Sequence, residues 1–139
     1  MAIAWVASST PASASTATNP SVDITITDAT DMVVAYGASL NPPTGVTFNG
    51  VVMTEAENIS NASSQNGIGI YYILDASLPP AGTYAVQATF GSADSQAMVG
   101  AVALSGTDQA APEASTEVAS TAPSRGITTG ITTITDGAW

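Results

Sequence analysis

Apolar and polar side chains alternate with a period of two over much of this chain, as they do in strands that bury one face. Residues 68–90 show this best, in two runs separated by a turn that contains Pro79, Pro80 and Gly82. On the face expected to be buried, the runs carry Ile68, Ile70, Tyr72 and Leu74, and then Tyr84, Val86, Ala88 and Phe90. The pattern predicts that the two runs pair with each other as the central antiparallel strands of a β-sandwich.

Further strands are predicted on both sides of this pair. Residues 22–27 alternate cleanly, and residues 32–40 are apolar on both faces, which is typical of a central strand. Asn49-Gly50 between two short apolar runs predicts a hairpin over residues 46–56, because a type I′ turn needs positive φ at both central positions. Residues 57–67 are polar and predict a loop, whereas residues 97–105 predict another inner strand.

Two tracts rich in Ser, Thr, Ala and Pro lack any periodicity and predict loops or arms: residues 8–20 and 107–125. No segment carries the apolar stripe of an amphipathic helix. The predicted fold class is therefore all-β, an antiparallel β-sandwich (jelly-roll or Ig-like) of about 8–9 strands with extended arms. We expect one domain, divided into an N-terminal strand and arm (residues 1–20), a sandwich core (residues 21–109) and a C-terminal arm and edge strand (residues 110–139).

The C-terminal residues echo an earlier segment. Residues 21–34 and 124–139 both place an ITIT-like run before a turn that contains Asp, and each follows a Ser/Thr/Pro tract. Chance similarity between Thr-rich strands is one explanation. The other is a repeated sheet whose last hairpin is unfinished, which leaves an edge that can accept a strand from a neighbour. Under that hypothesis the interface candidates are Ile127, Ile131, Ile134 and Trp139.

Charge narrows the classes of partner. Only 9% of the residues are charged, the net charge is −10, and Arg125 is the single basic side chain. Nucleic-acid binding needs a basic footprint, so we expect no nucleic-acid partner. Anionic membrane surfaces are disfavoured for the same reason, and no apolar run is long enough to span a membrane. A basic protein or divalent cations remain compatible with this charge.

Catalytic chemistry is poorly supported. The chain has no His, Cys or Lys, which removes Ser–His and Cys–His nucleophiles, zinc sites and Schiff bases. Glu55 and Glu57 are the remaining carboxylate pair, and we interpret them as solvated charges at the end of a strand. We therefore expect no enzyme activity and no cofactor. A weak calcium site is conceivable from three aspartates in or near one turn, although turn aspartates usually bond their own backbone: Asp23, Asp28 and Asp31.

Aromatic residues supply two more hypotheses. Trp5 and Trp139 are expected either to cap the core or to anchor a subunit contact, because Trp is enriched at interface centres. Tyr36, Tyr72 and Tyr84 are expected in the core. Tyr71 alternates with them and is expected at the surface, where it would be the glycan-stacking candidate.

Three segments together resemble a β-sandwich family that is common in phage structural proteins (decoration and tail surface proteins) and in bacterial surface proteins. They are GVTFNGVVMT at residues 45–54, a strand and turn with PPAGT at residues 71–83, and LSGTDQ at residues 104–109. The resemblance covers residues 22–112 and extends loosely into the C-terminal ITT segment. It implies a sandwich fold and no catalytic residues.

These observations lead us to expect a structural virion protein, foremost a phage capsid decoration (cement) protein that acts by adhesion between subunits. It would assemble with itself, most simply as a trimer, and with a major capsid or other shell protein. The expected location is the virion surface, after assembly in the host cytoplasm, with an extracellular location as the alternative. A glycan- or surface-binding module of a fibre or adhesin is the second hypothesis, and a filament subunit joined by strand exchange is the third.

Overall fold

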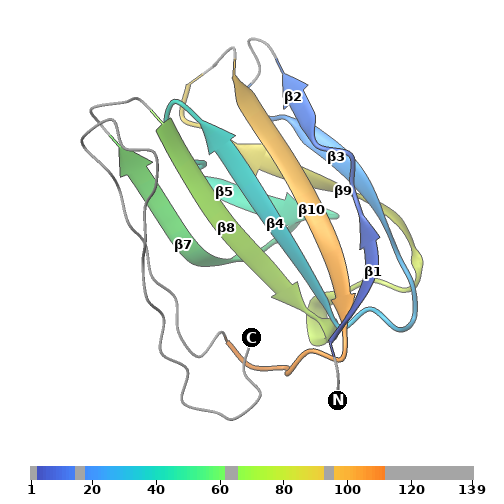
Figure 1. The fold of residues 1–139 in the computed structure, drawn as a ribbon. Coiled ribbons are helices and arrows are strands. Elements are labelled where there is room, and N and C mark those ends of the chain that lie inside the picture. The colour runs from blue at the N-terminus through green and yellow to red at the C-terminus, as the bar shows by residue number, and fades with distance from the viewer. Residues whose placement is uncertain (1–2, 15–17, 62–65, 93–95, 112–139) are drawn as a thin grey trace.

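The chain forms two antiparallel sheets packed face to face, as the computed structural model shows for residues 3–14, 18–61, 66–92 and 96–111 (Figure 1). The larger sheet, in front in Figure 1, contains β1 (Ala4–Ser8), β2 (Ala12–Ala14), β4 (Met32–Ser39), β7 (Thr54–Asn61), β8 (Asn66–Leu74) and β10 (Ala97–Ser105). The smaller sheet contains β3 (Ser21–Ile26), β5 (Gly45–Phe48), β6 (Val51–Val52) and β9 (Gly82–Thr89). A short 3-10 helix, η1 (Asp75–Ser77), links β8 to β9. The predicted all-β sandwich is confirmed.

Strand order places β4 in the middle of the larger sheet. That sheet runs β1-β10-β4-β8-β7, with β2 also paired to β10, and the smaller sheet runs β3-β9-β5-β6. The prediction that the two runs within residues 68–90 pair with each other is wrong. β8 pairs with β4 and β7, whereas β9 pairs with β3 and β5 in the opposite sheet. The turn between the two runs carries the chain across the sandwich instead of closing a hairpin.

The buried face of β8 is also the reverse of the predicted one. Tyr71 and Ile73 belong to the core, while Ile68 and Ile70 are each 41% exposed on the outer side. The cause lies in the connection from β4 to β5, which passes closely over the inner side of the sheet. A Cβ built on Gly69 would lie 3.0 Å from Cγ of Pro43. Only glycine fits on the inner side of β8 where Pro43 passes, so the neighbouring Ile68 and Ile70 point to the outer side.

Two segments predicted to be irregular are partly strands. The polar stretch at residues 57–67 belongs largely to β7 and β8, which pair from Thr54–Tyr72 to Asn61–Asn66 with a bulge between Glu55 and Glu57. Within the predicted N-terminal arm, residues 12–14 form β2 against β10. These two additions do not alter the layers, because both lie at the edges of the larger sheet.

The predicted hairpin and the inner strands are confirmed. Asn49 and Gly50 both have positive φ, of 50° and 78°, and connect β5 to β6. The hairpin ends early, because after Met53 the chain crosses to the larger sheet as β7. The core lies between the sheets and draws its largest fully buried side chains from both of them: Phe48, Ile24, Val33, Val46, Val86 and Val99, with Pro43. No helix in the described part of the chain is long and apolar enough to cross a membrane.

Candidate interaction surface on the larger sheet

The outer face of the larger sheet is apolar throughout its three central strands. Strand register assigns side chains to faces, because directly paired residues point to the same side of a sheet. Twelve positions of β10, β4 and β8 fall on the outer face, in four rows across the strands. None is charged, and Tyr supplies the only hydroxyls. The rows are Leu104–Met32–Leu74, Val102–Val34–Tyr72, Gly100–Tyr36–Ile70 and Met98–Ala38–Ile68.

The outer face of the smaller sheet has the opposite character. Apart from the exposed Val52 beside Thr47, its positions are polar or small, and Thr25 and Thr83 hydrogen-bond through their hydroxyls at 2.8 Å. A sheet that meets water usually shows this alternation of apolar inner and polar outer positions. The outer face of the smaller sheet therefore has the composition of a solvated surface, whereas the outer face of the larger sheet has the composition of a protein core. The polar positions are Ser21, Asp23, Thr25, Thr47, Thr83, Gln87 and Thr89.

Exposure identifies which part of the larger sheet is accessible. Trp5 on β1 pairs with Leu104, at the corner of the first row, and is 67% exposed. This excludes the hypothesis that Trp5 caps the core. Ile68 and Ile70 are each 41% exposed and Met98 is 37% exposed, so apolar side chains reach solvent at both ends of the face. Between these ends Met32, Tyr72 and Gly100 are buried. Exposed apolar side chains gathered on one face mark an interaction site in soluble proteins. We call the twelve positions and Trp5 the outer patch.

The tyrosines divide between the two sides of the larger sheet. Tyr36 is half-buried on the outer side, where its ring covers the space above Gly100, since a Cβ there would lie 2.6 Å from the ring. Tyr72, at 8% exposed, is on the same outer side. The prediction that these two residues lie in the core between the sheets is wrong, although Tyr72 is buried, because the register gives the inward positions to Val33 and Ala35 on β4 and to Tyr71 and Ile73 on β8. Tyr84 does pack against the core, with its ring 5.7 Å from that of Phe48.

Tyr71 is buried in the core at 2% exposed, so the prediction of a surface tyrosine is wrong. Its hydroxyl oxygen lies 3.2 Å from the carbonyl oxygen of Pro43 and 3.1 Å from Oε2 of Glu55. Nδ2 of Asn58 donates to the Glu55 carboxylate and to the Pro43 carbonyl. The group ties β7 and β8 to the β4–β5 connection. Its ring is not available to stack on a sugar, which removes the aromatic residue on which the glycan hypothesis depended.

This buried hydroxyl predicts a fall in stability at alkaline pH. Burial, followed by the hydrogen bond to Glu55, raises the pKa of Tyr71 from 10.0 to about 12. Because the folded state holds this proton more tightly than the unfolded state, the contribution is complete below pH 10 and is lost as pH rises from 10 to 12. We expect the free energy of unfolding to fall by up to about 2 kcal/mol over that range. Urea unfolding at several pH values measures it.

The matched control is Tyr71→Phe, which should be less stable at pH 8 but should lack this part of the alkaline fall. The chain suits the experiment because it contains no Lys or Cys, so only tyrosine side chains titrate between pH 9 and 12. Equal alkaline falls in the parent and in Tyr71→Phe would contradict the prediction.

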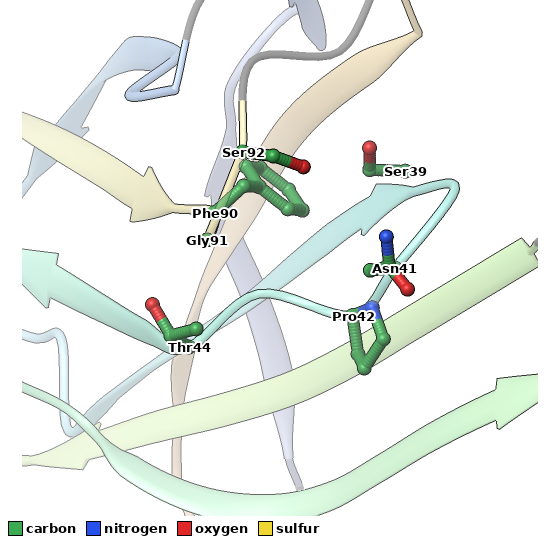
Figure 2. Close-up of a pocket in the computed structure, with 7 residues that line it drawn as sticks. All are labelled: Ser39, Asn41, Pro42, Thr44, Phe90, Gly91 and Ser92. Atoms are coloured by element: carbon green, nitrogen blue, oxygen red, sulfur yellow. The ribbon is translucent and has the colours of Figure 1, made fainter.

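A small hollow lies at one end of the sandwich, between the β4–β5 and β9–β10 connections (Figure 2). Its volume is about 230 Å³, below the roughly 300–1,000 Å³ of ordinary small-molecule sites. None of its lining residues titrates, and the Thr44 hydroxyl already donates to the carbonyl of Thr89 at 3.1 Å. Its geometry supports no acid–base chemistry. The lining residues are Ser39, Asn41, Pro42, Thr44, Phe90, Gly91 and Ser92.

The predicted calcium ligands do not form a site. Asp23 is exposed on the outer face of β3, and Asp28 is exposed in the following turn. The Asp31 carboxylate instead accepts a hydrogen bond from the backbone N–H of Gly106. Among the residues that the structure describes, no group of three or more acidic, His or Cys side chains is placed to hold a metal ion. The structure therefore does not bring these three aspartates together as a set of calcium ligands.

Of the predicted interface residues, Trp5 lies on the outer patch, whereas Ile127, Ile131, Ile134 and Trp139 fall outside the described residues. Sequence reasoning missed the rest of the patch. The available signal was the apolar character of residues 32–40 on both faces, which indicates a strand covered on both sides.

Comparisons with protein-family models, curated proteins and solved structures found no match for this chain.

Proposed function

We propose that this protein is a structural building block that works by adhesion through the outer patch. The observation that carries the proposal is the contrast between its two outer faces: one is mostly polar, and the other has no charged side chain and only two hydroxyls at its twelve central positions. Burial of apolar surface contributes about 25 cal/mol per Å², so a patch of this kind favours association strongly. A chain that stayed alone in water would gain nothing from such a face.

The setting that fits best is the surface of a virion, with the chain as a capsid decoration protein or a related head or tail surface component. The resemblance of residues 22–112 to phage structural sandwiches supports this setting. The hydroxyl-rich outer face of the smaller sheet suits the side that meets solvent, since Thr and Ser hydrate a pleated surface without charge.

The test is the mass of the protein in solution. We expect the parent chain to exceed the 13.8 kDa of a single copy by light scattering, and Trp5→Ser combined with Ile70→Thr to return it to that mass. Both side chains are largely exposed, at 67% and 41%, so the double variant should fold normally. Circular dichroism and urea unfolding check that it does.

The matched control is Val52→Thr, which removes an apolar side chain that is 76% exposed on the smaller sheet. It should leave the mass unchanged, because Val52 lies away from the outer patch. A control variant that dissociates as fully as the double variant would contradict adhesion through the larger sheet. Open-ended growth of the parent with concentration would instead favour the filament hypothesis.

A further inference from the structure

We infer that the partner on the outer patch is a second copy of this chain, packed sheet against sheet about a two-fold axis. The inference deepens the proposed function and rests on it. Under this inference the protein is a homodimer, whereas the sequence led us to expect a trimer. Three features carry it: the charge of the patch, its area, and the arrangement of polar residues around it.

Charge comes first. The chain carries a net charge of −10, so a basic partner would be the obvious choice if carboxylates lined the patch. They do not: among the cross-strand partners that extend the four rows, Glu57 at the β7 edge is the acidic one. Of the other described carboxylates, Asp23 lies on the smaller sheet and Asp28 in the β3–β4 turn, while Asp31 and Asp75 adjoin the end of the first row, outside the twelve positions. An uncharged patch favours an uncharged, apolar partner, and two acidic copies can meet there with their carboxylates apart.

Area comes second. The patch and its border together span five strand positions about 4.8 Å apart (β1–β2, β10, β4, β8 and β7) and four rows about 6.6 Å apart, which gives a face of roughly 600 Å². Two such faces would bury about 1,200 Å² in total, which reaches the lower end of specific protein–protein interfaces. The ring of Tyr36 covers the space above Gly100 and fills the middle of the patch. The filled surface suits the packing of two sheets at about 10 Å.

The border of the patch comes third. On the β1–β2 side the rows end at Trp5, Ser8 and Ser13, and on the β7 side they end at Thr54, Glu57 and Ile59, so most of the border is polar. Trp5 stands at one corner. An apolar centre, a polar rim and an exposed Trp are the usual anatomy of a protein–protein interface. In a two-fold pair each copy presents the same patch, so the apolar centres bury each other and the rims stay solvated.

Cross-linking through single cysteines tests the pair directly, because the natural chain contains no Cys. Ile70→Cys places a thiol on the outer patch, and Gln87→Cys places one on the exposed face of the smaller sheet. Each full-length variant is treated with a bismaleimide that spans about 10 Å, the separation of packed sheets. We expect Ile70→Cys to give a band of twice the monomer mass and Gln87→Cys to remain monomeric, with light scattering showing a doubled mass for the parent.

Other outcomes separate this inference from the proposed function. If neither variant cross-links, the parent is monomeric and an apolar dye binds it, the second copy is overturned while an adhesive patch for another protein survives. If neither cross-links and dye binds only after Ile131 and Ile134 are both replaced with Ser, the chain covers its own patch and both ideas are overturned. If both variants cross-link equally, association is unspecific and the two-fold pair is overturned.

Discussion

Gly67→Ala is expected to destabilise the protein by at least about 3 kcal/mol, at the upper end of what overpacking usually costs. The added Cβ would lie 2.0 Å from the backbone N of Pro42 and 2.4 Å from the carbonyl C of Asn41. Both contacts are with backbone, so no rotamer change can relieve them. Either β8 or the β4–β5 connection must move, and this connection also holds Pro43 against the Tyr71 hydroxyl.

Urea unfolding measures this effect, with loss of soluble protein as its extreme form. Gly45→Ala is the control, because a Cβ there meets no atom within 4 Å. That variant should stay within about 0.5 kcal/mol of the parent. Similar unfolding midpoints for the two variants would show that the β4–β5 connection does not cross β8 as closely as described.

Phe48→Ala is the second large effect, with an expected loss of about 3–5 kcal/mol. Phe48 is 0% exposed in the middle of the core, and its ring lies 5.7 Å from that of Tyr84. Truncation removes the ring from a packed space between the sheets and leaves a cavity that rigid strands cannot fill. The Tyr84 hydroxyl is held by the carbonyl of Pro80 at 2.8 Å, which limits how far that ring can move into the cavity.

Val52→Ala, in the same hairpin, is the control for this experiment. Its side chain is 76% exposed, so the change should cost less than about 0.5 kcal/mol. The slope of the urea transition should be unchanged in both variants if they unfold in one step. A small effect for Phe48→Ala would mean that the hairpin is not part of the core.

The sequence predicts strands best where the two faces differ in chemistry. In β3, Val22, Ile24 and Ile26 are buried as expected because Asp23 and Thr25 leave only one apolar side. The Asn49-Gly50 turn was predictable because its backbone conformation demands those residues. Local signals of these two kinds need no knowledge of the rest of the chain.

The sequence fails where both faces of a strand are apolar. In β8 alternation alone cannot choose between the Ile68 face and the Tyr71 face, since each is hydrophobic. The choice depends on Pro43, which lies more than twenty positions earlier and packs over Gly69 and Gly37. For the same reason the outer patch could not be predicted from the sequence, because its rows can be identified only when the register of β10, β4 and β8 is known. Trp5 alone was visible beforehand as a candidate.

The position of β10 also bears on how the chain folds during its synthesis. β10 carries β1 and β2 on one side and β4 on the other, and Ala4 pairs with Ser105, about a hundred residues later. At roughly 5–20 residues per second, the first two strands wait about 5–20 s on the ribosome for their partner. Until β10 emerges, the edge of β4 stays open. Nascent chains on neighbouring ribosomes of the same mRNA would then each expose an unpaired edge of β4. The distance between ribosomes and the access of chaperones should therefore influence the yield of correctly folded protein.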